Sequence, residues 1–337
     1  MTTLSNQLHH IGQLTRAIIN HPNDPLYTVI DQGNSMFQVT PTELAITIEN
    51  TVLHSLYEIL EGFPIHDFHP FISVFVRNAL DCNLRPSIEH HRALKKTDDL
   101  YQIGGDYDVM LDIIIRMRTF VKQILEVTGG FEFKDLIYNA HRTANKNHEG
   151  MVRYIDSLFE RYSRLAVIRL DLYEDGFIMS QRDIEKKYWQ AKYDLKHLLN
   201  NAKMNSLFDH MVGYIWTLEY GPERGYHYHL VLFFDGSQVR DDVYRAWEIG
   251  EYWKLVITNG RGSYWNCNAE KSKYPHLGIG MIHHRDVEKI NNLKQAAAYL
   301  IKVDHFVRML TPDGGRTFGR GILLPPRTGN VGRPRAA

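Results

Sequence analysis

The spacing of apolar residues predicts helices in the first half of the chain. Apolar positions recur at helical spacing over three segments that are bounded by capping residues, prolines or glycines. These segments cover residues 41–60, 71–80 and 106–127. Residues 139–150 are polar, and we place a domain boundary within that stretch. Residues 1–150 are therefore predicted to form a mainly helical accessory domain.

The second half of the chain predicts strands and helices in alternation. Strand-like apolar runs cover residues 165–172, 212–219, 226–234 and 278–283. Helical patterns cover residues 180–200, 238–256 and 287–310. This order, β-α-β-β-α-β-α, favours an α+β fold in which an antiparallel, ferredoxin-like or RRM-like sheet carries helices on one face. We expect this domain to span residues 151–321.

Composition excludes several classes of protein. No apolar run approaches the ~18 residues that a membrane-spanning helix requires, and the first 20 residues lack a signal-peptide pattern. The two cysteines, Cys82 and Cys267, argue against a disulfide framework and favour a reducing cytoplasm. The 39 lysines and arginines balance 39 acidic residues, so nucleic-acid binding would require a local basic patch.

One basic patch lies at the end of the chain. From Arg316 onward the sequence carries five arginines, including Arg320, and no acidic residue. Glycines and prolines interrupt this segment, and residues 322–337 are predicted to form a mobile tail. The tail would suit a DNA-binding arm that contacts phosphates, and a solubilising tail is an equally supported alternative.

The first candidate site is a metal site on a predicted hairpin. His227 and His229 are two residues apart on a strand, so their side chains share a face. If residues 221–225 form the hairpin loop, Glu219 faces His227 and completes a three-ligand site. Two imidazoles and a carboxylate suit Mg²⁺ or Mn²⁺, and the imidazoles favour Mn²⁺. A one-residue slip would make Glu223 the substitute, and each histidine could instead be an ordinary surface or core residue.

The second candidate site lies on the last predicted helix. The apolar stripe of this helix consists of Ile290, Leu293, Ala297, Leu300 and Ile301. Tyr299 lies opposite the centre of that stripe, and Lys302 lies about one step around on the same side. Tyr299 is therefore not needed for the apolar stripe, and a large aromatic residue with a lysine one turn on calls for another explanation. A partly exposed tyrosine without a function is the alternative.

Taken together, these motifs resemble the HUH endonuclease superfamily of rolling-circle replication initiators and relaxases. A closer resemblance is to replication proteins of the inovirus gene-two-product type, which include the cryptic-prophage YagK/YfjJ proteins. The similar motifs fall within residues 161–321, at 225–230, 249–253, 264–268, 278–280, 298–302 and 316–319. The order of strands and helices is also similar.

This resemblance implies a site-specific nickase that initiates rolling-circle replication of a filamentous phage or prophage in the bacterial cytoplasm. It implies His227 and His229 as metal ligands, with Glu219 as the third, and a divalent cation, Mg²⁺ or Mn²⁺, as the cofactor. It further implies that Tyr299 forms a 5′-phosphotyrosyl bond and that Lys302 assists it. The implied partners are single-stranded or hairpin origin DNA and a host helicase.

Three further residues are candidates for contacting unpaired bases. Trp265, Asn266 and Asn268 fall in a predicted loop, where an aromatic ring and two amides could stack on bases and hydrogen-bond to them. A packed loop without a DNA contact is the alternative. Asp171 on the first predicted strand could line the metal site, but a surface carboxylate is the favoured interpretation.

Two other functions fit the same motifs. A transposase or a conjugative relaxase would use the same chemistry on a different DNA. A prophage regulator would keep the fold and bind DNA without forming a covalent adduct.

Overall fold

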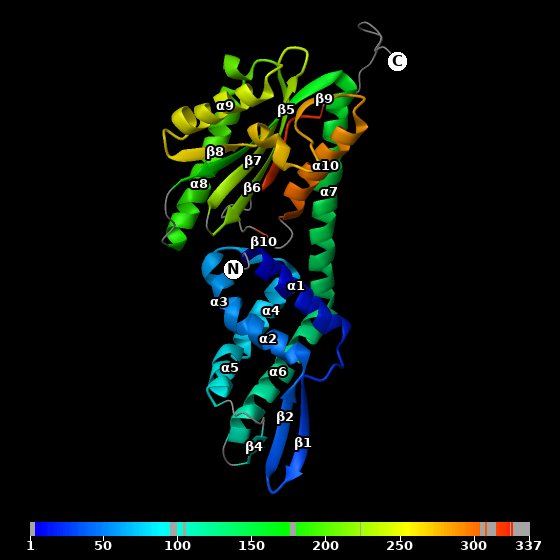
Figure 1. Cartoon of the computed structure of the whole chain (residues 1–337), viewed down its shortest axis with the longest axis vertical. Coiled ribbons are helices and arrows are strands. Elements are labelled where there is room, and N and C mark those ends of the chain that lie inside the picture. Colours follow the sequence, from blue (N-terminus) through cyan, green and yellow to red (C-terminus); the bar gives the residue numbers. More distant parts are fainter. Residues whose placement is uncertain are drawn as a thin grey trace. The chain divides into compact units, whose positions relative to one another are not determined.

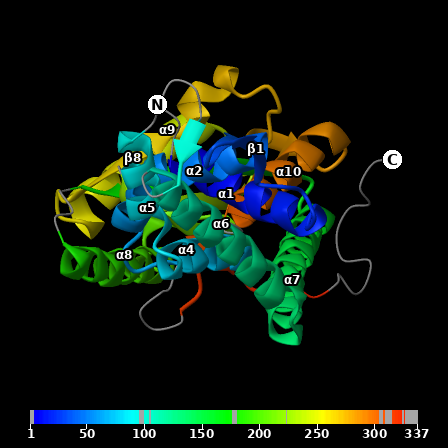
Figure 2. The ribbon, with the colours of Figure 1, turned by 90° about the horizontal axis from the view of Figure 1, so that it is seen from below.

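The computed structural model describes residues 4–94, 100–103, 106–175, 180–222, 224–303, 307–308, 315–323 and 325. The chain divides into two compact units, residues 1–141 with 306–308 and residues 142–305 with 309–337 (Figure 1). Figure 2 shows the same ribbon from below. The division falls within helix α7 (Phe131–Arg161). This helix includes the polar stretch at residues 139–150. Among the described residues, no helix combines the length and apolar character that crossing a membrane requires.

The first unit is mainly helical, as its apolar spacing predicts. Its helices are α1 (Leu4–Asn20), α2 (Glu43–His54), α3 (Leu56–Gly62), α4 (Pro70–Asp81), α5 (Leu84–Ala93) and α6 (Asp106–Gly129). The single helix expected over residues 41–60 is two helices, because the chain bends at Ser55. Apolar residues from several helices form the core of this unit, and the rings of Phe75 and Phe120 meet edge to face with centroids 5.1 Å apart.

Antiparallel strands also occur in the first unit, and the sequence does not predict them. Strands β1 (Tyr27–Gly33), β2 (Met36–Pro41) and β4 (Leu100–Gln102) form one sheet, and β3 (Asp67–Phe68) pairs with β10 (Val307–Arg308). Only Tyr27 of β1 is buried, so the strand has no alternation of buried and exposed positions. Without that alternation its sequence gives no period-two signal.

The second unit is built around one antiparallel sheet. Its strands are β5 (Arg164–Glu174), β6 (Met211–Gly221), β7 (Gly225–Asp235), β8 (Gly262–Asn266), β9 (Gly280–His283) and β11 (Phe318–Arg320). The order across the sheet is β11-β6-β7-β5-β8, and β9 also pairs with β5 (Figure 1). One edge of β5 pairs with β7, whereas β8 and β9 share its other edge. Strands β8 and β11 are not predicted from the sequence.

Helices cover both faces of this sheet. Helix α8 (Gln181–Asn201) packs on one face, where the rings of Tyr188 and Tyr226 lie 5.5 Å apart. Helix α9 (Asp242–Tyr252), followed by a π-helical turn (Trp253–Ile257), lies on that same face, because Gly250 contacts the ring of Tyr264. The second half of α7 and helix α10 (Val287–Val303) pack on the opposite face.

The α+β class and the antiparallel sheet are thus confirmed, but the prediction of helices on one face is wrong. The last part of α7 packs against the second face of the sheet. Its residues Tyr154 and Leu158 are buried in one core cluster with Val167, Ile215 and Phe233 of the strands. The polar stretch at residues 139–150, in the middle of α7, precedes this core-facing segment and conceals it in the sequence. Helix α10 ends at Val303, earlier than the expected residue 310.

Candidate metal centre

The β6–β7 hairpin sets the geometry of the centre. Glu219 pairs with His227 and Thr217 pairs with His229, which is the predicted register. Opposed residues on antiparallel strands share a face, so the carboxylate projects beside both imidazoles. Gly225 starts β7 with φ +65°, a conformation that favours glycine in the turn. Glu223, the substitute ligand for a slipped register, lies outside the described residues.

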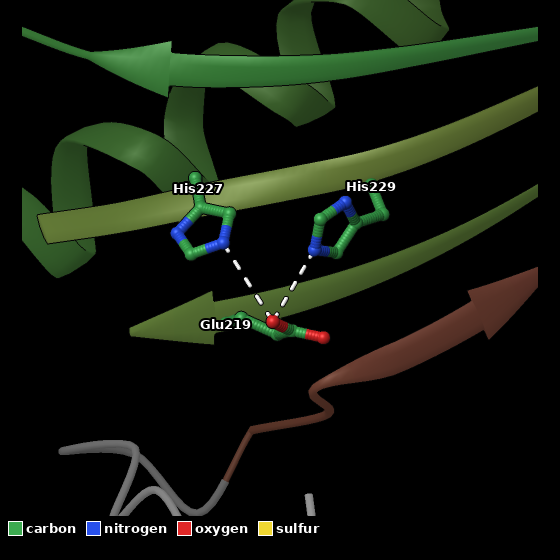
Figure 3. A group of neighbouring side chains, drawn as sticks. All are labelled: Glu219, His227 and His229. Atoms are coloured by element: carbon green, nitrogen blue, oxygen red, sulfur yellow. Dashed lines mark ion pairs between the residues drawn. The ribbon is translucent and has the colours of Figure 1, made fainter. Parts of the chain in front are cut away.

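Glu219, His227 and His229 converge on one point (Figure 3). The Oε2 atom of Glu219 lies 3.6 Å from Nε2 of His227 and 3.2 Å from Nε2 of His229. The two rings are nearly perpendicular, at 86°, with centroids 5.1 Å apart. One ligand atom from each residue lies within 4.8 Å of the other two. The spacing therefore allows one cation to contact all three side chains.

Hydrogen bonds behind the rings orient both imidazoles. Nδ1 of His229 donates to Oδ1 of Asp171 at 2.7 Å, and Nδ1 of His227 donates to the carbonyl of Gly225 at 3.2 Å. Since a carbonyl or carboxylate oxygen accepts the bond, the proton resides on Nδ1 and Nε2 faces Glu219. Arg169 donates to Asp171 at 3.2 Å and holds that carboxylate in place. Such outer contacts fix the ring orientation of metal-binding histidines.

The charges in the centre are strongly coupled. Burial alone would raise the pKa of Glu219, but hydrogen bonds with His227 and His229 outweigh it and lower the pKa to about 2. Burial would lower the pKa of His229, but its hydrogen bonds with Asp171 and Glu219 raise the pKa to about 9. Two buried carboxylates thus surround His229 and favour positive charge at this position.

The donor set fits a divalent cation. Oε1 of Glu219 is buried and has no hydrogen-bond partner among the described residues, so it remains available as a ligand. Two imidazole nitrogens with carboxylate oxygen suit Mn²⁺ and related ions, and fewer oxygens than Mg²⁺ usually takes are present. The structure thus contains a possible metal-binding triad at the predicted residues.

Tyr299 lies on the helix that packs against the same face of the sheet. Ile290, Leu293 and Ala297 of α10 are buried in a core cluster with Val231, which follows the two histidines on their face of β7. Tyr299 is 68% exposed, as expected for a residue off the apolar stripe. No described contact joins Tyr299 to the triad, and the side chain of Lys302 lies outside the described residues.

The predicted base-contacting residues lie on a strand and a 3₁₀ segment, which corrects the expected loop. Trp265 is on β8 and 45% exposed, whereas Asn268 in the segment Cys267–Lys273 is 1% exposed. The amide of Asn268 accepts from the backbone N–H of Arg169 at 2.8 Å and donates to the carbonyl of Val167 at 2.9 Å. The prediction that Asn268 contacts DNA is therefore wrong, because its amide fastens this segment to β5.

Asn266 also has a structural role. Its side-chain oxygen accepts from the backbone N–H of Asn268 at 3.0 Å and of Ala269 at 3.1 Å, and its amide nitrogen donates to the carbonyl of Val243 at 3.1 Å. These bonds start the 3₁₀ segment and tie it to α9. Of the three candidates, Trp265 alone keeps an exposed side chain without such bonds among the described residues.

The two arginines differ in their surroundings. The guanidinium of Arg320 on β11 lies 5.3 Å from the ring centroid of Tyr154 and donates to the carbonyl of Gly321 at 3.1 Å. Arg316 is exposed. The remaining arginines of the predicted tail lie outside the described residues.

Sequence reasoning missed the residues that support the triad. Asp171 was favoured as a surface carboxylate, yet its side chain is 13% exposed and contacts both His229 and Arg169. Strand β5 is buried on both faces over residues 165–168 and alternates from Arg169 onward, but alternation within one strand does not show which of its faces lies beside the histidines. The pairing of Asp171 with His229 shows that Asp171 faces the histidines. This pairing joins residues far apart in the sequence, so the sequence alone does not reveal it.

A comparison with known families gives one match. The family described as YagK/YfjJ C-terminal domain matches residues 128–321, which is more than half of the chain. The matched segment contains the triad, Asp171 and all of α10. No curated protein and no solved structure matches the chain.

Proposed function

Since the chain belongs to the YagK/YfjJ C-terminal domain family, we propose that it is a metal-dependent nickase and strand transferase acting on single-stranded DNA. The observation that carries this proposal is the triad of Glu219, His227 and His229 on the sheet face against which the Tyr299 helix packs. We assign the sheet to a ferredoxin-like HUH endonuclease fold. The biological role that follows is initiation of rolling-circle replication of a filamentous phage or prophage.

The triad would hold the metal through Nε2 of both histidines and the carboxylate of Glu219. When bound, a divalent cation supplies positive charge that polarises the scissile phosphate and stabilises its developing charge. Asp171 and the carbonyl of Gly225 keep the Nδ1 protons away from the ligand positions. The protein thus supplies a site in which the ligands are oriented before DNA arrives.

Tyr299 would perform the cleavage. Its phenolic oxygen forms a bond to the phosphorus, the bond from phosphorus to the 3′ oxygen breaks, and the phenolic proton ends on the 3′-hydroxyl. A 3′-hydroxyl later attacks the phosphotyrosyl bond and returns the proton, which rejoins the strand without ATP. We assign to Lys302, three residues after Tyr299 in the sequence, the role of contacting the phosphate or assisting proton transfer.

The partners of this activity would be origin DNA with an unpaired segment and a helicase of the bacterial host. The helicase is proposed from the family resemblance, as the partner that would supply ATP-driven unwinding.

Adduct formation tests the proposal. Full-length protein is incubated with Mn²⁺ or Mg²⁺ and labelled single-stranded DNA from the neighbouring intergenic region, and adducts are separated on a denaturing gel. We expect wild type to form an adduct and both Tyr299→Phe and His227→Ala to form none. Tyr193→Phe is the matched control, because Tyr193 is comparably exposed, at 64%, on helix α8 of the opposite sheet face.

Two results would contradict the proposal. Adduct that persists in Tyr299→Phe would remove Tyr299 as the nucleophile. Tight DNA binding by wild type without any adduct on origin-containing DNA would favour a non-catalytic DNA-binding regulator.

A further inference from the structure

Two rows of side chains cross the sheet on the face that carries the metal centre. Pairing across β6, β7, β5 and β8 places Glu219, His227, Tyr173 and Ser263 in one row. The neighbouring row consists of Thr217, His229, Asp171 and Trp265. Since paired residues share a face, the aromatic rings of Tyr173 and Trp265 lie on the same side of the sheet as the triad.

The two aromatic residues extend from the metal centre toward the β8 edge. The ring of Tyr173 stacks on that of His227, with centroids 5.6 Å apart and planes 24° apart. Trp265 is two strands beyond His229, about 10 Å across the sheet. Tyr173 and Trp265 therefore lie on adjacent strands, in neighbouring rows, between the triad and the β8 edge.

Basic groups accompany both rings. The guanidinium of Arg224 lies 6.0 Å from the ring centroid of Tyr173, and Nζ of Lys273 lies 5.5 Å from that of Trp265. Aromatic rings with basic groups beside them are the surface that single-stranded nucleic acids recognise, because unpaired bases stack and phosphates pair with cations. A duplex keeps its bases stacked inside and offers no free base to such rings.

Trp265 is not required to hold β8 in the sheet. The neighbouring Tyr264 packs against Gly250 of α9, and Cys267 is fully buried on the other side. The amides of Asn266 and Asn268 fasten the following segment to its surroundings. The large exposed ring of Trp265 is therefore left for a contact outside the core.

We infer that this sheet face is a binding track for single-stranded nucleic acid, on which Tyr173 and Trp265 stack successive bases beside the metal centre. Arg224 and Lys273 contact the phosphates along the track. The substrate class rests on the proposed function, and the track deepens it by placing the unpaired nucleotides next to the scissile phosphate along β5 and β8.

Equilibrium binding without metal separates the track from the chemistry. Full-length protein is titrated into a fluorescently labelled oligothymidylate of about 16 nucleotides in EDTA, and anisotropy gives the Kd. We expect Trp265→Ala to raise Kd about 5- to 150-fold, the effect of losing one stacked base, and Trp265→Phe to retain most of the affinity. Tyr173→Ala should weaken binding similarly, and Tyr173→Phe should not.

Two matched controls are present in the same unit. Trp189 on α8 and Trp247 on α9 are 49% and 48% exposed, close to the 45% of Trp265, but these helices cover the opposite face of the sheet. Trp189→Ala and Trp247→Ala should therefore leave Kd unchanged. A duplex of the same length should bind without dependence on Trp265.

Several results would overturn the track. They are absence of oligothymidylate binding by wild type, an unchanged Kd for Trp265→Ala, or an equal loss for Trp247→Ala. Ultraviolet cross-linking of wild type to the same oligonucleotide keeps the inference testable if an alanine variant fails to fold. Cross-links should map to the peptides containing Tyr173 and Trp265, and cross-links confined to α8 or α9 would refute the track.

Failure of the track and failure of the nickase are distinguishable. Trp265-dependent binding by a wild-type protein that forms no adduct would leave the track standing and remove the catalytic proposal. Adduct formation by wild type together with unchanged binding by Trp265→Ala would support the nickase and refute the track.

Discussion

Asp171 orients one imidazole of the candidate metal centre. Its carboxylate accepts a hydrogen bond from Nδ1 of His229, and Arg169 donates a second hydrogen bond to the same carboxylate. Residues in this position behind a ligand typically change metal affinity 10- to 100-fold when they are replaced. The neutral side chain of an Asp171→Asn variant keeps one acceptor but loses the charge that directs the imidazole.

We therefore expect Asp171→Asn to weaken Mn²⁺ binding about 10- to 100-fold, measured by isothermal titration calorimetry. Asp175→Asn is the control, because Asp175 is exposed just beyond β5 and accepts from Ser263 at 2.7 Å instead of from a histidine. Equal Mn²⁺ affinity for wild type and Asp171→Asn would show that Asp171 does not support the site.

The triad could be predicted from the sequence because its three ligands are local. A glycine-bounded turn and alternating strands fix which residues face each other, so Glu219 falls beside His227 without knowledge of the rest of the fold. Asp171 could not be assigned in this way. The alternation of its strand from Arg169 onward does not reveal the neighbouring strand, and its contact with His229 spans 58 residues of sequence.

Gly278 determines how closely α10 approaches the rest of its unit. A Cβ at this position would lie 2.4 Å from the backbone nitrogen of Leu293, and a backbone cannot move aside as a flexible side chain can. Gly278→Ala therefore forces α10, which carries Tyr299, to shift.

We expect Gly278→Ala to lower the free energy of unfolding by about 1–3 kcal/mol in urea titrations, the usual cost of overpacking. The same variant should form less DNA adduct, because its tyrosine helix is displaced. Gly221→Ala serves as the control, since a Cβ there meets nothing within 4 Å. Equal stability of the two variants would show that the close contact between Gly278 and the backbone of α10 does not limit the residue at position 278.

Elements with a strong periodic pattern of apolar residues could be predicted from the sequence. Short strands and the polar part of a long helix could not. The helices at α4 and α6 and the β6–β7 hairpin begin and end close to where apolar spacing and capping residues indicate. Strand β11 has only three residues, and β8 has no regular alternation of buried and exposed positions. The polar part of α7 gave no apolar stripe by which to recognise it.

The second unit buries two acidic groups near one arginine. Arg261 lies 3.3 Å from Glu174 on β5 and 3.1 Å from Asp194 on α8. Burial, reinforced by Asp194, raises the pKa of Glu174 to about 8, although Arg261 and Lys187 oppose the shift. The folded protein therefore binds a proton here at pH values where the unfolded chain, with an ordinary glutamate, does not.

A group whose pKa is raised on folding stabilises the folded state below its unfolded pKa, and the contribution is lost as pH rises through its folded pKa. Between about pH 4.5 and pH 8, Glu174 should thus make unfolding easier as pH rises. Glu174→Gln removes the titrating group. The free energy of unfolding of this variant should therefore fall less than that of wild type as pH rises over this range. Urea titrations at both ends of the range measure the difference.

Glu185→Gln, an exposed change on α8, should show the pH dependence of wild type. If Glu174→Gln also keeps the wild-type dependence, the protonated buried glutamate is not present in the folded protein.

The shared edge of β5 has a consequence for how the chain folds as it is made. Strand β8 leaves the ribosome roughly 90 residues after β5, about 5–20 s later at ordinary rates of synthesis, and β9 later still. Throughout that interval the second edge of β5 has no strand to pair with, which is the condition under which nascent chains associate with one another. The hairpin with all three metal ligands emerges well before that edge is closed.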